Sequence, residues 1–300
     1  MYNGIINIYK EKGFTSHDVV AKMRGICRQK KIGHTGTLDP DAEGVLPVCL
    51  GAGTKLCDML TDKDKEYVAE LLLGVKTDTQ DITGQVLCEK EPVQDEELIR
   101  ACVEGFQGEY MQVPPMYSAL KVNGKKLYEL ARAGKEVERA ARPVFIHEID
   151  ILEINVPVVK MRVACSKGTY IRTLCEDIGE KLGCGGTMKS LLRTKVGHFG
   201  LDKALTLQQL EEVRDEGKIE EYIFPVESAF AECPTLHVLP EWKKLIDNGN
   251  AFYTNQTAEN KRYEAGVWVK VYAGKKFYGV YTYEPEKRRY KPVKMFLTEE

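Results

Sequence analysis

The chain reads Gly33-His-Thr-Gly-Thr-Leu-Asp-Pro-Asp-Ala-Glu-Gly44 near its N-terminal end, with three glycines, one proline and three acidic residues in twelve positions. Glycine adopts backbone conformations that other residues resist, and proline stiffens the chain directly after Asp39. Such a stretch predicts a loop with a single conformation, and reactive side chains often lie in loops. Two interpretations stay open here. Asp39 is an oriented carboxylate and His34 a ring that contacts a ligand, or Asp39 caps a backbone amide in a tight turn.

Strands and helices alternate on both sides of this loop. Short strands are predicted at 5–9 and 45–50, and Ser16 is a plausible N-cap for a helix whose apolar residues recur at helical spacing. Further strands are expected at 67–73, 144–154 and 158–165, and further helices at 95–106, which ends at Gly108, and at 169–182, which ends at Gly183. This mixture indicates an α+β enzyme domain of about 230 residues.

The residue pattern of the sequence changes after an acidic stretch at 211–232. A short helical segment around 242–246 is followed by two compact runs rich in β-formers, 266–272 and 277–283, with Gly274 between them. Runs of this kind predict a small β-rich unit of about 65 residues. We therefore expect two domains, 1–234 and 235–300.

Composition excludes several classes of protein. The 300 residues are 43% hydrophobic and 29% charged, which is typical of globular proteins rather than disordered ones. Apolar runs long enough to span a membrane and a secretory leader are both lacking. The nine cysteines are scattered without C-x-x-C spacing and the five histidines are dispersed, so we expect reduced thiols in a cytoplasmic protein without a metal site.

Net charge alone does not suggest a nucleic-acid partner, since it is only −2 with an isoelectric point near 6.3. The distribution is more informative. Residues 24–31 hold four basic side chains and no acidic one, and 270–294 is also rich in Lys and Arg. Such asymmetry can give a basic face to a neutral chain, although each charged run is equally consistent with a solvated surface.

Other chemistries find little support. The nucleophile elbow G-x-S-x-G is absent, and Gly51-Ala-Gly-Thr-Lys55 lacks the spacing of a phosphate-binding loop. A second cluster, Cys165-Ser-Lys-Gly-Thr-Tyr-Ile-Arg-Thr-Leu174, places Arg172 one turn into an expected helix, where it could reach a carboxylate of a neighbouring loop. From the residues alone, Arg172 is equally a surface residue and Tyr170 a core aromatic.

Taken together, these stretches resemble the TruB family of bacterial tRNA pseudouridine synthases. Residues 33–40 are similar to the family signature, and further blocks match in the family's order: 65–69, 113–121, 124–128, 166–173 and 191–194, followed by Gly197 and Phe199. The resemblance covers residues 4–230. One departure lies at Lys10-Glu-Lys-Gly13, because the family usually has a proline where Glu11 stands.

The resemblance implies a fold and an activity. The fold would be that of pseudouridine synthases, with a mixed, mainly antiparallel central sheet flanked by helices, and with a small PUA-like RNA-binding domain at the C-terminus. The activity would be isomerisation of uridine to pseudouridine at position 55 in the T-loop of tRNA, with the target base flipped out of its stack. Neither a cofactor nor a metal is expected, and we expect a monomer without an obligatory protein partner.

The resemblance also implies roles for individual residues. Asp39 would be the catalytic nucleophile, or the base in a glycal route, and Arg172 would keep it charged and aimed. Tyr67 would stack on the uracil and take part in proton removal from C5. Two further residues, Tyr170 and Leu191, would line the uracil pocket. The ring of His34 would stack where the flipped nucleotide leaves, and Lys10 and Lys55 would bind phosphates.

Three competing functions are weighed against this one. A non-catalytic RNA-binding protein on the same scaffold would lack the nucleophile, which is present here as Asp39. A guide-RNA-dependent relative would need partner proteins and would not act on bare tRNA. A hydrolase with an aspartate nucleophile would need a water-activating partner that the sequence does not reveal.

Overall fold

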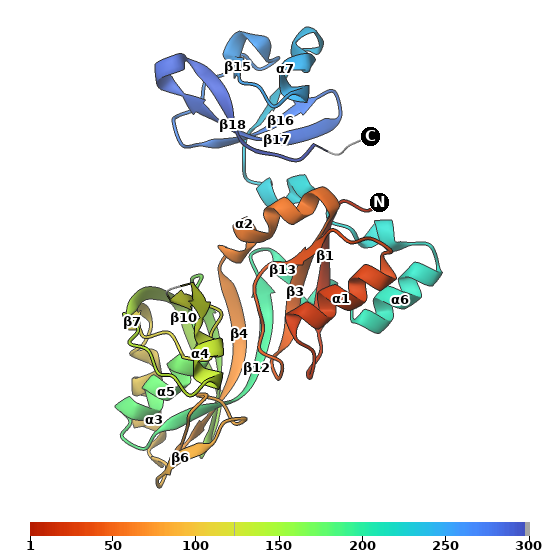
Figure 1. Ribbon diagram of the computed structural model, residues 1–300. Coiled ribbons are helices and arrows are strands. Elements are labelled where there is room, and N and C mark those ends of the chain that lie inside the picture. The colour runs from red at the N-terminus through yellow and green to blue at the C-terminus, as the bar shows by residue number, and fades with distance from the viewer. Residues whose placement is uncertain (123, 298–300) are drawn as a thin grey trace.

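A computed structural model describes residues 1–122 and 124–297. Its centre is a nine-stranded sheet in the order β1-β3-β12-β4-β11-β10-β7, to which β2 adds beside β3 and β13 beside β12 (Figure 1). The strands are β1 (Gly4–Lys10), β2 (Ile32–His34), β3 (Glu43–Leu50), β4 (Lys65–Leu73), β7 (Gly108–Gln112), β10 (Arg142–Asn155), β11 (Val158–Cys165), β12 (Gly186–Val196) and β13 (Phe199–Gly200). Strands β12 and β3 pair in parallel and the other pairs are antiparallel, so the expected mixed, mainly antiparallel sheet is confirmed.

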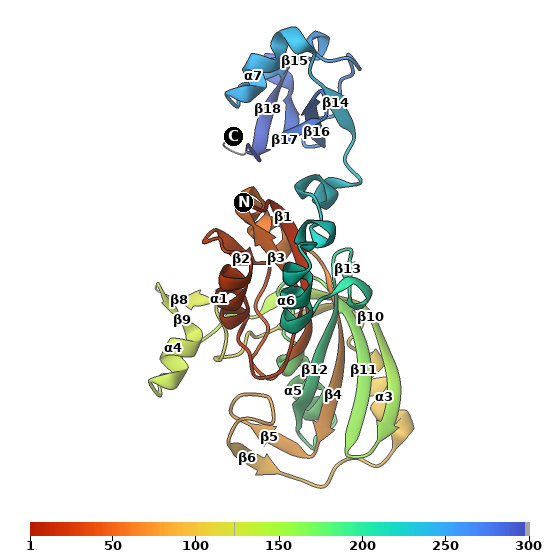
Figure 2. The same ribbon diagram turned by 90° about the vertical axis from the view of Figure 1, so that its right-hand side faces the viewer.

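Helices flank this sheet in two groups (Figures 1 and 2). Helices α1 (Ser16–Ile26) and α6 (Leu207–Asp215) pack with β1, β2 and β3, whereas α3 (Glu96–Glu104) and α5 (Ile171–Lys181) pack with the strands of the other half. Shorter elements complete the domain: α2 (Cys57–Thr61), α4 (Leu127–Arg132), the pair β5 (Val75–Thr77) and β6 (Val86–Glu89), and the pair β8 (Lys121–Val122) and β9 (Lys125–Lys126). None of the helices in the described residues is long and apolar enough to cross a membrane.

Burial along β4 alternates with period two. Lys65, Tyr67, Ala69, Leu71 and Leu73 are buried, and the residues between them are half-exposed on the opposite face. Because successive side chains of a strand point to opposite faces, one face of β4 joins the core with α3 and α5. Tyr67 therefore lies on the side of the sheet that is covered by helices.

Several predicted element boundaries are wrong by a few residues, among them three at helix ends. The N-cap of α1 is Thr15, whose hydroxyl accepts from the Asp18 amide at 3.1 Å, while Ser16 is the first helical residue. Helix α3 ends at Glu104, because the chain must turn before Gly108, which begins β7. Helix α5 begins at Ile171, two residues later than expected.

A second, five-stranded sheet lies at one end of the molecule (Figure 2). It has the order β14-β16-β17-β18-β15, with β14 (Thr235–His237), β15 (Phe252–Tyr253), β16 (Trp268–Ala273), β17 (Lys276–Glu284) and β18 (Arg289–Met295), and the short helix α7 (Lys243–Asp247) packs beside it. This curled sheet is the expected PUA-like unit. Val280 and Phe296 reach back into a cluster with Leu56, Leu60 and Phe230, so apolar contacts join the two parts.

Candidate active site

The loop between β2 and β3 holds Asp39, and hydrogen bonds fix this loop from several sides. The Leu38 amide donates to Ser16 Oγ at 3.0 Å, which joins the loop to the start of α1. The Gly13 amide and Lys10 Nζ donate to the Pro40 carbonyl at 2.9 and 3.0 Å, so the segment at 10–13 is tied to the loop although it lacks the usual proline.

Gly44 closes the loop at a position that only glycine fits. Its φ is +107°, and a Cβ there would lie 2.2 Å from the Arg193 carbonyl oxygen of β12. A side chain would therefore separate β3 from β12 at the one place where they pair in parallel. The close approach brings the loop up to the middle strands of the sheet.

Asp39 and Arg172 form a two-point contact. Arg172 Nε lies 2.9 Å from Asp39 Oδ2, and Nη2 donates to Oδ1 at 3.3 Å. The Arg172 side chain is 6% exposed, whereas that of Asp39 is 38% exposed, so the carboxylate is aligned from the protein side and open on the other. A bidentate pair of this kind fixes the direction of the carboxylate. The side chain of Asp39 thus binds an arginine rather than capping a backbone amide.

Arg172 is itself held by backbone carbonyls. Its Nη1 donates to Thr79 O at 3.0 Å, and its Nη2 donates to Tyr117 O at 2.8 Å. Asp81 Oδ2 lies 3.9 Å from Nε, which places a second carboxylate beside the guanidinium. Asp81 is a site residue that the sequence analysis missed, because nothing in its local pattern indicates contact with a helix ninety residues away.

Tyr67 lies beside this pair and is almost fully buried. Burial raises its pKa to about 12, and Asp39 acts in the same direction, while the Arg193 guanidinium lowers it. Tyr67 is therefore a neutral phenol at physiological pH. Its neighbour Arg193 was also missed: the block at 191–194 had been matched, but only the pairing of β12 with β4 brings Arg193 opposite Tyr67.

Tyr170 and Leu191 are the two residues expected to line the uracil pocket. Tyr170 is the N-cap of α5, and buried Gln112 clamps its backbone, accepting from its amide at 2.7 Å and donating to its carbonyl at 3.0 Å. Burial raises the pKa of the Tyr170 hydroxyl. The charge of Arg172 lowers this pKa, and the charge of Asp39 raises it. Leu191, on β12, packs against the core cluster that contains Tyr67.

His34 ends β2 and meets a second histidine that the sequence analysis did not single out. The rings of His34 and His17 meet edge to face, with centroids 5.2 Å apart. Burial lowers the pKa of His34 to about 4, and the nearby charges of His17 and Arg193 act in the same direction. His34 is therefore neutral at physiological pH. A neutral ring is compatible with stacking on a base, because stacking requires no charge.

The pKa of His34 predicts a pH dependence of stability. Its folded-state pKa of about 4 lies below the unfolded value of about 6.5, so the unfolded chain takes up a proton first as the pH falls. The free energy of unfolding should fall between pH 6.5 and pH 4, and His34→Gln should make that fall shallower by up to about 1.4 kcal/mol per pH unit. Urea denaturation at a series of pH values measures the slope. Equal slopes for wild type and His34→Gln would contradict the assignment.

Lys10 does not occupy the position expected of a phosphate contact. Its side chain is fully buried, and Nζ donates to the carbonyls of Phe14, Pro40 and Glu11 at 2.7, 3.0 and 3.1 Å. Desolvation lowers its pKa to about 8, although nearby acidic groups oppose the shift. All three donors of the ammonium group are engaged, so we revise the expected role of Lys10 to anchoring the Asp39 loop.

The revised role of Lys10 gives a second prediction. Lys10→Met should lower the free energy of unfolding by about 2–4 kcal/mol, because three charge-assisted hydrogen bonds lose their donor. It should leave the salt dependence of tRNA affinity unchanged, since no phosphate contact is lost. Lys12→Met, at an exposed neighbour, is the matched control and should not affect stability. A flattened salt dependence in Lys10→Met would restore the phosphate assignment.

Lys55 lies at the junction of the two sheets, away from Asp39. Its Nζ donates to the Met295 carbonyl of β18 at 2.9 Å. The side chain is exposed at the surface, so a phosphate contact there remains a prediction, but Lys55 is not part of the constellation around Asp39.

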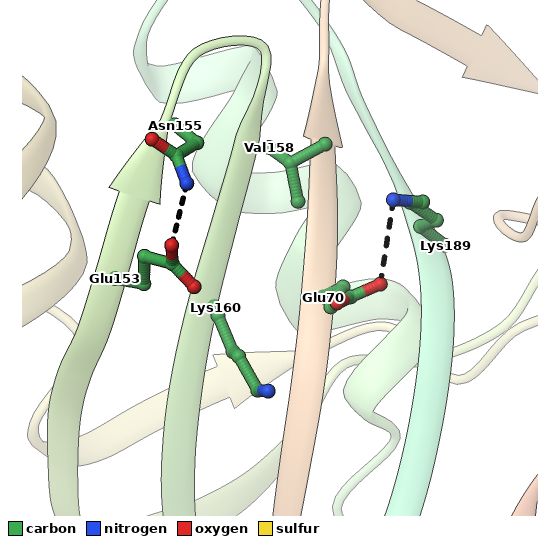
Figure 3. Close-up of a pocket in the computed structure, with 6 residues that line it drawn as sticks. All are labelled: Glu70, Glu153, Asn155, Val158, Lys160 and Lys189. Carbon is green, nitrogen blue, oxygen red and sulfur yellow. Dashed lines mark hydrogen bonds and ion pairs between the residues drawn. The ribbon is translucent and has the colours of Figure 1, made fainter.

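A hollow on the other face of the sheet does not belong to this site. Glu70 of β4 and Lys189 of β12 lie 3.5 Å apart there, and Asn155 Nδ2 donates to Glu153 (Figure 3). Its six lining residues are Glu70, Glu153, Asn155, Val158, Lys160 and Lys189. Glu70 lies on the face of β4 opposite to Tyr67, so the hollow is separated from Asp39 by the sheet. Within the described parts of the chain, no group of three or more His, Cys, Asp or Glu side chains could hold a metal ion.

Solved structures with the same fold support a class assignment. A chain in the structure of an H/ACA RNP bound to a substrate RNA containing 2′-deoxyuridine has a TM-score of 0.74 at 26% identity. A chain in a Cbf5-Nop10-Gar1 complex has a TM-score of 0.73 at 30% identity, and each comparison covers 98% of this chain and 85% of the other. Together with an aspartate aligned by a buried arginine beside a tyrosine, this fold defines a pseudouridine synthase.

Family comparisons narrow the class. Residues 24–171 match the model of the TruB family pseudouridylate synthase N-terminal domain, and residues 172–231 match that of the tRNA pseudouridylate synthase B C-terminal domain. The tRNA pseudouridine synthase B of Lachnoclostridium phytofermentans is 54% identical over 98% of this chain and 100% of its own length. That of Alkaliphilus oremlandii is 46% identical over 99% of each chain. The chain belongs to the TruB family of pseudouridine synthases.

Proposed function

We propose that the protein isomerises uridine to pseudouridine at position 55 in the T-loop of tRNA, with Asp39 as the nucleophile and the target base flipped out. Membership of the TruB family supports a tRNA uridine as the substrate. The observation that carries the catalytic assignment is the Asp39 carboxylate, half-exposed and aligned by the buried guanidinium of Arg172 at 2.9 Å.

This geometry suits a reaction at the sugar carbon. Asp39 attacks C1′ as the N1–C1′ bond breaks, and the electron pair of that bond leaves with N1 of the uracil. The uracil then turns, and C5 forms the new bond to C1′ as the aspartate departs. The reaction has no net redox change and consumes no water. In the glycal alternative, the same carboxylate removes a sugar proton, and its position relative to Arg172 serves both routes.

The base must be presented to Asp39 outside its stack. Flipping costs a few kcal/mol, and stacking on an aromatic ring returns about 1–3 kcal/mol per base. Tyr67 and Tyr170 are the aromatic residues that flank the carboxylate, and Leu191 adds an apolar wall. His34 would stack on the RNA that the base leaves. Its position directly before the Asp39 loop, and its edge-to-face contact with His17, support this role.

We also propose that the chain divides into two domains between residues 234 and 235. The protein would work as a monomer in the cytoplasm without an obligatory protein partner.

The C-terminal sheet would contact tRNA phosphates. Lys275 and Arg288 are exposed there. If both contact phosphates, the double variant Lys275→Gln/Arg288→Gln should reduce the slope of log affinity against log salt by about 0.7–0.9 per contact. Affinity measured over a salt series tests this, with the exposed Lys203→Gln as control. Parallel lines of equal slope would exclude phosphate contacts by these two side chains.

The function is tested with the purified chain and an unmodified tRNA transcript. Pseudouridine mapped by position should appear at 55 and be absent from a transcript with cytidine at that position. Modification at a different uridine would correct the site. Activity that requires an added guide RNA or partner protein would favour the kind of assembly in which the structural neighbours were solved.

A further inference from the structure

Arg193 is the largest side chain that the described residues bury completely, and its strand lies between the two halves of the active site. On one side it pairs with Tyr67 of β4, and on the other with Gly44 of β3. Its Nε donates to the Val45 carbonyl at 2.7 Å and its Nη2 to the Gly36 carbonyl at 3.2 Å. Direct pairing of the two residues across β12 and β4 sets the guanidinium beside the phenol of Tyr67, close enough for their charges to affect one another.

The guanidinium lacks a carboxylate partner in the described part of the chain. Instead, it lies near Lys10, His34 and Lys65, whose pKa values are lowered mainly by burial and further by the charge of Arg193. An uncompensated buried charge costs several kcal/mol even after relaxation, and an apolar side chain of similar size would join β12 to its neighbours at less cost. A charge kept at such a position indicates a use for the charge itself.

Among the charged groups, Arg193 has the largest effect on Tyr67. Cys165 of β11 and Asp39 disfavour negative charge on the phenol oxygen, whereas Arg193 favours it. Because the two side chains come from directly paired residues of neighbouring strands, their relative position is set by the sheet.

We propose that Arg193 is a positioning residue for Tyr67, which fixes the phenol ring and stabilises negative charge on its oxygen while the C5 proton of the substrate is removed. The inference rests on the proposed function. It adds a residue that acts on the substrate through Tyr67 and does not touch the RNA.

The proton transfer balances as follows. After C5 has bonded to C1′, it still carries its hydrogen, and the ring has a C6=N1 double bond. The C5–H electron pair forms the C5=C6 bond, the C6=N1 pair moves onto N1, and N1 takes a proton from water. The released proton passes to the Tyr67 oxygen as its own O–H proton passes to water. Partial negative charge on that oxygen is the charge that Arg193 stabilises.

A spectroscopic test needs no RNA. Tyr67 is replaced by 3,5-difluorotyrosine, whose more acidic phenol titrates at a pH where the folded protein can be measured, and the ¹⁹F shift is followed against pH. Arg193→Gln should raise the midpoint by about one pH unit or more, because a neighbouring charge of opposite sign is lost. Arg193→Lys should raise it less. Lys195→Gln, at an exposed residue of the same strand, should leave it unchanged. An unchanged midpoint in Arg193→Gln would overturn the proposal.

A kinetic test separates positioning from a purely structural role. Arg193→Gln should slow single-turnover pseudouridine formation by about tenfold or more, while the Kd for tRNA changes less than about twofold. Added to Tyr67→Phe, the same substitution should cause no further loss of rate. Additive losses would mean that Arg193 only ties strands together. If Arg193→Gln does not fold, Arg193→Lys is used for both tests. A shifted midpoint in a protein that makes no pseudouridine would reject the proposed function and leave the Arg193–Tyr67 interaction supported.

Discussion

Asp39→Asn is expected to reduce pseudouridine formation by more than about 10³-fold, because an amide is neither a nucleophile nor a base at the sugar carbon. Binding of tRNA and the fold should persist, since the amide is nearly isosteric and its oxygen still accepts from Arg172. The measurement is single-turnover conversion of a tRNA transcript, with a filter-binding Kd and a thermal melt on the same preparation.

Asp41→Asn is the matched control for this prediction. Asp41 lies two residues further along the same loop, and it is exposed. The control removes the same charge from the loop without touching the contact with Arg172, so its rate should stay near that of wild type. Substantial turnover in Asp39→Asn, or an equal loss in both variants, would remove Asp39 from the centre of the mechanism.

Arg172→Lys should slow the reaction by about 100-fold, which corresponds to about 2.7 kcal/mol, although it keeps the positive charge. An ammonium group cannot reproduce the two-point contact with Asp39 while it also reaches the carbonyls of Thr79 and Tyr117. The carboxylate would lose its fixed direction. The loss should therefore appear in kcat, with a much smaller change in KM.

Arg162→Lys provides the comparison for Arg172. Arg162 lies on β11 and pairs with Glu66, Glu148 and Asp150 on the half-exposed face of the sheet. The same substitution there tests the general effect of exchanging an arginine in an ion-pair network, and it should leave kcat unchanged. A wild-type rate in Arg172→Lys would show that orientation of Asp39 does not depend on the guanidinium.

The sequence by itself determined the family, the fold class and the central pair of the site. The loop at 33–44 is informative without a structure because its glycines and proline constrain the backbone locally, and blocks in a fixed order are a property of the chain alone. The sequence likewise predicted strands at 67–73 and 158–165, where β4 and β11 lie. Errors in the predicted elements fell at their ends, where Thr15 rather than Ser16 caps α1, because both hydroxyl residues can cap and only the surrounding contacts choose between them. Strand β12, by contrast, was not predicted at all.

Tertiary structure alone decided which charges meet. Lys10 is expected from the resemblance to contact a phosphate, yet its side chain is buried and donates to three carbonyls, because the chain around it folds over its side chain. Asp81 and Arg193 reach the site from segments more than forty residues from Asp39, through strand pairing and helix packing that no local pattern encodes. Hydrophobic periodicity specifies which face of an element is buried, but the partner across the sheet depends on strand order. The residues that orient and polarise the reactive groups are therefore the part of this site that only the folded chain discloses.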